Sequence, residues 1–270
     1  MHSVRSLVLA CIALMACMVH SGCGSGNTEP EVATAELPEP AAVVPPLELM
    51  EALSGQWMPA AYCQCLFEQR SVFTCGSTME EIFVMTVERA GGDSLRWTYI
   101  TTHEGGPEAT LGYDETNKAF TYRPKEDEYL GYDMIDLRSI DANTMEFRHD
   151  PNKAVQRFRR VISADALLND ALFVGAYRVD GDTDLVHFTP EGRILGPFDH
   201  SHFTVLTDLT EGLHDRDIVF LHDGNYDWDS DAYHFQHRGD ELLLHPMLAA
   251  EEQYVYTMGD LKYRLTRVER

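Results

Sequence analysis

The chain has 270 residues, of which 21 are Lys or Arg and 44 are Asp or Glu, so its formal net charge is −23. A hydrophobic content of 44% is typical of a globular protein rather than of a disordered or fibrous one. A strongly negative chain repels phosphate backbones, which proteins bind through clustered Lys and Arg. The composition therefore argues against nucleic acid as a partner.

Residues 1–22 have the pattern of a signal peptide for secretion. Arg5 precedes an uninterrupted run of 13 residues without a polar side chain, Leu7–Val19. A membrane-spanning helix needs roughly 20 apolar residues, so this run is too short to span a bilayer. We expect the segment to be removed and the mature protein to be extracytoplasmic.

The end of this segment resembles the lipobox of bacterial lipoproteins. Ser21 and Gly22 precede Cys23, which in that family becomes the acylated N-terminal residue. His20 stands where the family has an aliphatic residue. Cys17, with a Leu three positions before it, is the alternative lipidation site, and secretion without lipidation is the remaining alternative. The resemblance implies a lipid anchor in a membrane of the bacterial cell envelope, since buried acyl chains contribute about 0.8 kcal/mol per CH₂.

Residues 23–46 have the composition of an acidic, Pro-rich linker. From Gly24 to Pro46 there are five Pro and four Glu, without an aromatic residue, Lys or Arg. Such a segment cannot bury a core and is self-repelling. We expect it to act as a tether that holds the folded part away from the membrane.

The remaining chain contains an internal echo that predicts two similar domains, 47–162 and 163–270. The Gly-x-aromatic motif in residues 52–57 is repeated in residues 171–177, and the Arg-containing segment 157–161 resembles 264–268. A turn followed by a short apolar strand also corresponds, at 143–147 and 239–244. The order of these echoes is that of a duplicated unit, although chance similarity among β-rich sequences is the alternative.

Each half is expected to begin with a short helix and to continue as strands. The helices are predicted at 47–53 and at 167–172, where Ser163 is the expected N-cap. Alternating patterns predict strands such as 83–87, 95–99 and 120–122, and turn residues predict hairpins around Gly239 and Gly259. Around eight short strands per half predict a mainly β protein with two antiparallel β-barrels or sandwiches.

A short helix leading into Gly-x-Trp, with an Arg on the last strand, resembles the calycin or lipocalin arrangement. In that family the Arg packs across the aromatic ring and closes the base of the barrel. The matching residues are, in the first half, Gly55, Trp57 and Arg160, and in the second half, Gly175, Tyr177 and Arg267. The resemblance implies two calycin-like barrels that bind a small apolar or amphipathic ligand.

Four alternating aromatic residues of the first half are the candidate lining of such a ligand cavity. They are Trp97, Tyr99, Phe120 and Tyr122. The competing interpretation is that these rings form an ordinary core, because alternating aromatic residues usually pack against one another.

Three cysteines follow the lipobox, and an extracytoplasmic location favours a disulfide between two of them. If residues 63–75 form a hairpin, Cys63 and Cys65 share a strand face and only one can reach Cys75. A Cys65–Cys75 bond sets Phe67 against Phe73 across the strands. We therefore predict the pair Cys65 and Cys75, with Cys63 free.

Eight of the 12 histidines lie in the second half, where they suggest a transition-metal site. His200 and His202 would point to one side of a strand, and His222, Asp223 or His234 could supply a third ligand. The Glu that cupin-like His-x-His motifs place four or five residues later is missing. Solvated histidines are the alternative, and no other cofactor is expected.

The remaining motifs give no support for catalysis. The acidic segment 223–231 departs from a calcium-binding EF-hand at the positions of the required Gly and Glu, so it is interpreted as an acidic turn. No Gly-x-Ser-x-Gly or phosphate-cradling loop is present. We expect a non-enzymatic, lipid-anchored binding protein for a small apolar ligand. The alternatives are a structural or interaction module with a protein partner in the envelope, and a His-based metal protein or metal-dependent enzyme.

Overall fold

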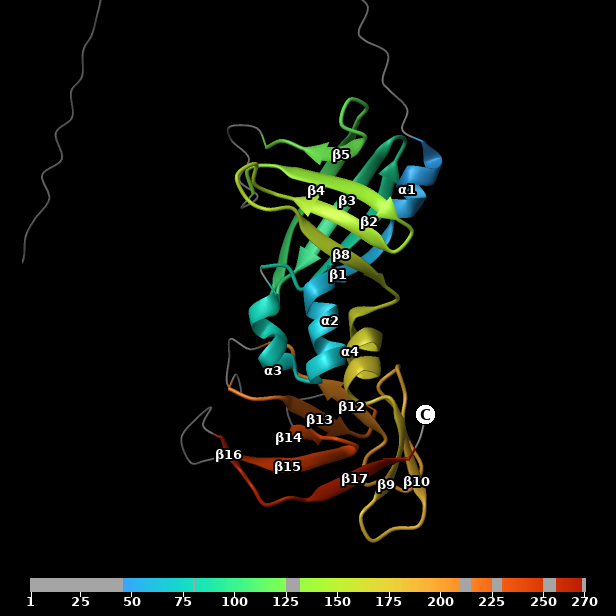
Figure 1. Cartoon of the computed structure of the whole chain (residues 1–270), viewed down its shortest axis with the longest axis vertical. Coiled ribbons are helices and arrows are strands. Elements are labelled where there is room, and N and C mark those ends of the chain that lie inside the picture. The colour runs from blue at the N-terminus through green and yellow to red at the C-terminus, as the bar shows by residue number, and fades with distance from the viewer. Residues whose placement is uncertain are drawn as a thin grey trace, which may run out of the picture. The chain divides into compact units, whose positions relative to one another are not determined.

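The chain folds into two antiparallel, barrel-like β-sheets with four short α-helices among the described residues, which confirms the mainly β fold class (Figure 1). The structure is a computed structural model, and it describes residues 46–79, 81–124, 132–208, 215–224, 230–249 and 256–268. These residues all belong to one compact unit, Ala42–Arg270. The expected signal peptide, both candidate lipidation sites, Cys17 and Cys23, and the linker up to residue 45 lie outside the described residues.

The first sheet is a closed barrel in which each strand pairs with the next along the chain. Its strands are β1 (Gly55–Pro59), β2 (Val84–Gly91), β3 (Ser94–Ile100), β4 (Gly105–Asp114), β5 (Ala119–Tyr122), β6 (Ile135–Asp141), β7 (Thr144–Arg148) and β8 (Gln156–Val161). The last strand returns to the first, which places Gln56 opposite Val161. A ring closed in this way leaves no unpaired sheet edge.

The second sheet has nine strands and repeats the same up-and-down order in eight of them. They are β9 (Gly175–Val179), β10 (Leu185–Phe188), β11 (Ile194–Leu195), β12 (His202–Val205), β13 (Ile218–His222), β14 (Asp231–Arg238), β15 (Glu241–Ala249), β16 (Tyr256–Met258) and β17 (Tyr263–Val268). β9 lies between β10 and β17, as β1 lies between β2 and β8. The two end strands, β11 and β12, approach each other through an isolated bridge between Arg193 and His202 and a 2.8 Å hydrogen bond from Phe203 N to Gly192 O.

The register of the closing strands repeats as well. Trp57 lies opposite Arg160 in the first barrel, and Tyr177 lies opposite Arg267 in the second. Beside each pair, the backbone N–H of the arginine donates to the turn between the two preceding hairpin strands, at Asn143 O (2.9 Å) and Asp240 O (2.8 Å). The internal echo in the sequence is therefore matched by equivalent positions in the two sheets.

Each first strand is preceded by a short helix, as predicted. α1 (Leu47–Leu53) leads into β1, and α4 (Ala164–Leu172) leads into β9. The Ser163 hydroxyl caps α4 by accepting a 3.0 Å hydrogen bond from Ala166 N. Both strands begin with a glycine at positive φ, 134° at Gly55 and 153° at Gly175, a conformation that residues with a Cβ rarely adopt.

The prediction of a hairpin around the cysteines is wrong, because residues 60–78 contain three consecutive helical elements between β1 and β2. They are α2 (Ala60–Gln69), α3 (Val72–Cys75) and the 3₁₀-helix η1 (Gly76–Thr78). Tyr62, Cys63 and Leu66 are buried on one face of α2, a spacing typical of a helix. The alternation of cysteines was thus misread as strand periodicity.

A second correction concerns the turn at Gly259. The sequence predicts that the strands on either side of this turn pair with each other, but β16 pairs with the end of β15 instead, where Leu248 lies opposite Thr257. β17 pairs with the beginning of β15, from Glu241 to Leu244. The long β15 therefore pairs with β17 along its first half and with β16 along its second half, and β16 has no place in the eight-strand order of the barrel.

The helices inserted after β1 share a buried core with the second barrel. Tyr62, Leu66 and Val72 belong to the same apolar cluster as Phe173 and Leu242. The inward side chains of the first barrel form a separate cluster. The insertion is also held by a 2.9 Å hydrogen bond from Phe73 N to the Asp217 carboxylate.

Candidate functional site

The arginine at the base of each barrel lies over the predicted aromatic ring, as expected. The Arg160 guanidinium carbon is 4.6 Å from the Trp57 ring centre, and that of Arg267 is 5.6 Å from the Tyr177 ring centre. Arg160 also donates to the carbonyl oxygens of Ser54 (2.5 Å) and Ala142 (2.8 Å). These contacts give the arginines a structural role, because they satisfy carbonyls at the end of the preceding helix and in a neighbouring turn.

The closing arginine packs closely against the glycine that begins the first strand of each barrel, and the positive φ of that glycine disfavours any residue with a Cβ. A Cβ at Gly55 would lie 3.1 Å from Arg160 Nη1, and one at Gly175 would lie 2.9 Å from Arg267 Nε. The Gly-x-aromatic motif and the closing arginine are therefore parts of one packing unit in each barrel.

The four predicted ligand-lining residues of the first half all lie in or against the interior cluster of the first barrel. Trp97 and Phe120 are completely buried, while Tyr99 and Tyr122 are partly buried against them. The Trp97 ring stacks on Phe147 at a centroid distance of 5.9 Å and contacts Tyr99 at 5.0 Å. The rings occupy the interior themselves, which favours the core interpretation of these residues.

The interior of the second barrel is filled in a similar way. The Phe173 ring lies 5.1 Å from the Phe203 ring and 4.9 Å from the Phe235 ring, and Phe188 lies 5.3 Å from Phe203. All four side chains are at most 3% exposed. The α2 side chains complete this cluster at one end of the barrel.

A polar cluster that the sequence did not reveal lies at the other end of the second barrel, where β14 and β17 begin. Lys262 Nζ donates a 2.8 Å hydrogen bond to the Tyr233 hydroxyl, and it lies 4.9 Å from the Tyr263 ring centre. The Tyr263 hydroxyl donates to the Asp199 carboxylate. The hydrogen bond with Tyr233 raises the pKa of Lys262 above its ordinary value, so this ammonium is held in its charged form.

The structure brings two of the three predicted metal ligands together. His202 and His222 lie opposite each other on β12 and β13, and their rings stack at 5.7 Å. Each ring forms a hydrogen bond with the hydroxyl of a nearby residue. His202 Nδ1 lies 2.9 Å from Ser201 Oγ, and His222 Nε2 lies 3.1 Å from the Thr204 hydroxyl.

The third predicted ligand, His200, is engaged elsewhere, since its Nε2 lies 3.3 Å from an Asp231 carboxylate oxygen. Within the described ranges, no three His, Cys, Asp or Glu side chains converge as a metal ion requires. A transition metal bound by His200, His202 and His222 stays a prediction, and the metal content of a His200→Ala/His202→Ala variant measures it.

The predicted disulfide is confirmed, although the hairpin used to predict it is not. Cys65 and Cys75 are bonded, with their Cα atoms 5.6 Å apart, and they link α2 to α3. Phe67 and Phe73 are 40% and 46% exposed and do not form the expected cross-strand pair. Cys63 is free and buried, and burial raises the pKa of its thiol to about 11, so it is an unreactive core residue.

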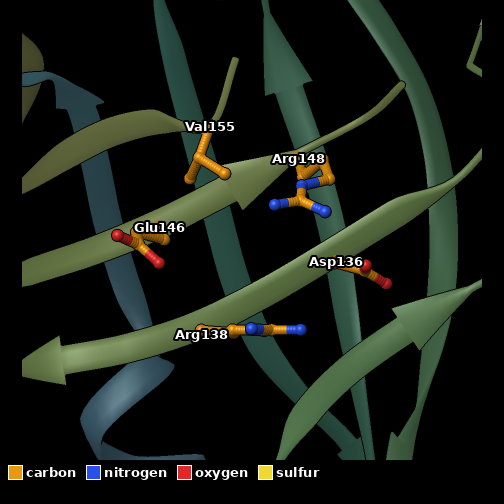
Figure 2. A pocket seen from close by; sticks show the side chains of 5 residues that line it. All are labelled: Asp136, Arg138, Glu146, Arg148 and Val155. Carbon is orange, nitrogen blue, oxygen red and sulfur yellow. The ribbon is translucent and has the colours of Figure 1, made fainter. Parts of the chain in front are cut away.

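A shallow, open hollow lies on the outer wall of the first barrel, between β6 and β7. Its lining is charged except for one side chain: Asp136, Arg138, Glu146, Arg148 and Val155. We call these five residues the arginine hollow (Figure 2). This hollow was not predicted from the sequence. A signal was present, because Asp136, Arg138, Glu146 and Arg148 alternate with the buried Leu137 and Phe147 and so share the outer face of their strands.

Comparison with protein-family models, curated proteins and solved structures found no match. Among the helices of the described residues, none is both long and apolar enough to cross a membrane.

Proposed function

We propose that this protein is a lipid-anchored, extracytoplasmic recognition module of the cell envelope, whose two barrels bind a partner protein with their outer surfaces. The observation that carries the proposal is the filling of both barrel interiors by the chain's own aromatic side chains. A carrier of a small apolar ligand needs an internal pocket of several hundred Å³. The function is therefore assigned to the outer surface, and lipocalin-like carriage of a small ligand becomes the competing proposal.

The surface that best suits a partner is the hairpin of β15 and β16. This hairpin extends β15 past its pairing with β17, and Figure 1 shows β16 at the margin of the second sheet. Tyr256 and Met258 of β16 point to one face of this hairpin and are 36% and 51% exposed, whereas Leu248, 52% exposed, points to the other face because it lies opposite Thr257. Neighbouring exposed apolar side chains of this size commonly mark protein–protein contacts.

The anchor is supported by the lipobox-like residues before Cys23. Metabolic labelling with a fatty acid tests it in cells that export the protein. We expect label on the wild type and on a Cys17→Ser variant, and none on a Cys23→Ser variant. Label that is lost only with Cys17→Ser would move the anchor to the alternative site, and an unlabelled wild type would remove it.

Native mass spectrometry of the protein, purified with its anchor in detergent, separates surface recognition from ligand carriage. We expect the mass of the processed chain alone, two hydrogens lighter than the fully reduced chain because of the disulfide. An organic molecule that is released only on denaturation would support ligand carriage and contradict surface recognition.

Site-specific photo-crosslinking tests the hairpin surface. A photoreactive residue at Tyr256, which shares a face of β16 with Met258, is expected to give one defined adduct in intact cells, and a Met258→Glu substitution in the same chain is expected to abolish it. The matched control is the same photoreactive residue at Thr110, an exposed position on β4 of the first barrel. Equal adducts from both positions, or an adduct that survives Met258→Glu, would contradict a specific contact at the hairpin.

A further inference from the structure

The arginine hollow is built from two cross-strand pairs on the outer face of β6 and β7. Asp136 lies opposite Arg148, and Arg138 lies opposite Glu146. Between these pairs, Leu137 lies opposite Phe147, and both side chains point into the barrel and are fully buried. The two arginines therefore occupy diagonal positions on one face, within reach of each other's long side chains (Figure 2).

Both carboxylates of the hollow are already engaged by arginines from outside it. Arg123 Nη1 lies 2.9 Å from Asp136 Oδ1, and Arg123 also donates to the backbone oxygens of Tyr122 and Ile135. Arg157 on β8 lies 3.9 Å from Glu146. Since each carboxylate has a cation on its far side, neither is available as a full counter-charge for the arginines inside the hollow.

Arg138 and Arg148 make no ion pair and no side-chain hydrogen bond within the part of the chain that the structure describes. Among the described residues that line the hollow or pair with its carboxylates, four guanidinium groups, those of Arg123, Arg138, Arg148 and Arg157, stand against the two carboxylates. A local surplus of positive charge is unusual in a chain whose net charge is −23. The screening length at physiological salt is about 8 Å, so charges farther away than this contribute little to the local potential. The groups of the hollow, rather than the distant acidic surface, therefore determine which ion is attracted.

We propose that the arginine hollow is a binding site for a phosphate monoester group, held between the guanidinium groups of Arg138 and Arg148. A guanidinium binds an oxyanion best through two parallel N–H donors. One carboxylate has only two oxygens, which is enough for a single guanidinium bound in this way. Two guanidinium groups on different strands therefore favour an anion with more oxygens than a carboxylate has. A phosphate monoester has three terminal oxygens and carries a charge of about −1.5 to −2 at neutral pH, which matches the two surplus cations.

The proposal is independent of the partner-binding surface of the second barrel, because the hollow lies on β6 and β7 of the first barrel. Val155 provides the only apolar wall of the hollow, so the group that carries the phosphate is expected to make few apolar contacts there. The shared chemistry is the monoester, which a soluble phosphorylated compound or a lipid with a terminal phosphate can equally present.

The experiment is a titration of the full-length, exported protein with inorganic phosphate, following the Nε–H signals of ¹⁵N-labelled arginines by NMR. We expect a saturable shift of two arginine signals, which are identified by their loss in Arg138→Gln and Arg148→Gln. The double variant is expected to bind phosphate at least about tenfold more weakly, since it loses charged hydrogen bonds from both sides. Both side chains point outward and have no ion-pair or hydrogen-bond partner among the described residues, so the thermal unfolding of the double variant should match the wild type.

Two further variants distinguish specific binding of phosphate by these two guanidinium groups from non-specific electrostatic attraction. Arg138→Lys/Arg148→Lys keeps the charge but loses both forked donor sets, and it is expected to bind more weakly than the wild type. Arg96→Gln removes an exposed arginine from β3 of the same barrel, one that is paired with Glu88, and it should leave the titration unchanged. A non-saturating shift, or equal affinity in the wild type and the double glutamine variant, would overturn the proposal.

Titrations with three further ligands test whether the site prefers a phosphate monoester and whether that group comes from a soluble compound or a lipid. Glycerol 1-phosphate should bind as a soluble monoester, whereas a phosphodiester such as glycerophosphoglycerol should bind more weakly, and equal affinity for the two would overturn the monoester assignment. Phosphatidylcholine nanodiscs with added phosphatidic acid present the monoester on a membrane. A shift of the same two signals there indicates a lipid source, and a shift with glycerol 1-phosphate alone indicates a soluble one.

Discussion

Arg160 shows how a single side chain can close a barrel. Its guanidinium covers the Trp57 ring and donates to Ser54 O, at the junction between α1 and β1, and to Ala142 O, in the turn between β6 and β7. Charge-assisted hydrogen bonds contribute about 1.5–3 kcal/mol each, and a cation–π contact contributes about 0.5–2 kcal/mol.

We therefore expect Arg160→Ala to lower the free energy of unfolding by about 3 kcal/mol or more, because several carbonyls lose their donor at once. Urea denaturation of the purified variant measures the change. Arg96→Ala on the outer face of β3 is the control and should leave the free energy of unfolding almost unchanged, because Arg96 forms only an exposed ion pair with Glu88. Equal effects of the two substitutions would show that Arg160 is merely another surface arginine.

Asp217 is the residue whose protonation state affects how the inserted helices are held. Burial raises the pKa of this carboxyl above its ordinary value, although hydrogen bonds from Ser71, Phe73 N and Val72 N and the nearby His234 act in the opposite direction. A carboxyl with a raised native pKa binds its proton more tightly in the folded than in the unfolded state. Stability therefore falls as pH rises from the ordinary pKa of Asp through the raised native value.

Asp217→Asn is expected to remove this part of the pH dependence while its amide oxygen still accepts from Phe73 N. The variant should be at least as stable as the wild type at neutral pH, and the difference between the two should shrink on acidification below the ordinary Asp pKa. Unfolding free energies measured in urea across this pH range provide the comparison. A variant that loses stability most strongly at neutral pH would show that the charged carboxylate is net favourable.

At the scale of the elements, the disulfide fixes the short α3 onto α2. The bond closes a small loop, with a sequence separation of 10 residues, and the chain-entropy model assigns such a loop about 3 kcal/mol. Cys63 stands two residues before this bond but takes no part in it.

We expect Cys65→Ser/Cys75→Ser to lower the free energy of unfolding by about 3 kcal/mol and to make stability insensitive to reducing agent. Cys63→Ala is the matched control, since it should keep the full response to reducing agent. The measurement is urea denaturation with and without a reductant. If the wild type itself shows no response to the reductant, the bond does not stabilise this part of the fold.

Sequence patterns predicted the strands well where one face of a strand is buried and the other is exposed. The segments around Met85, Trp97 and Phe147 alternate in this way, and all three were placed on strands. The helix at 60–69 was missed because Cys63 and Cys65 were interpreted as a strand pair, whereas the burial of Tyr62, Cys63 and Leu66 follows a helical period.

The candidate sites were harder to predict than the fold. The pairing of Trp57 with Arg160 follows from a motif whose parts sit at the two ends of one domain, so a resemblance could locate it. The arginine hollow depends instead on which of several arginines remain without a carboxylate, and that depends on the register between β6 and β7 and on the position of Arg123. A single sequence does not contain this information.

At the scale of the whole described molecule, the second barrel depends on residues that precede it by about half the chain. Its core cluster includes Tyr62 and Leu66 of α2 and Val72 of α3. Without these helices, apolar surface at one end of the barrel would be exposed to water, at a cost of roughly 25 cal/mol per Å².

We expect residues 163–270 produced alone to bind a hydrophobic dye and to unfold without a cooperative transition, whereas residues 47–270 should unfold cooperatively. Dye fluorescence and circular dichroism during urea denaturation test both fragments. A well-dispersed NMR spectrum and a cooperative transition for residues 163–270 would show that the second barrel folds without the helices.

The pairing of first with last strands sets the order in which this chain can fold as it is made. Gln56 must wait for Val161, and Ala176 must wait for Val268, so neither barrel can close before nearly all of its own residues have been synthesised. The first barrel completes its ring while α2 still lacks the apolar partners that β9–β17 supply. During that interval the nascent chain exposes the buried face of α2, and contacts that span so much sequence form slowly. Newly made molecules therefore pass through a partly folded, aggregation-prone state, and this is the state in which a chaperone would bind the chain.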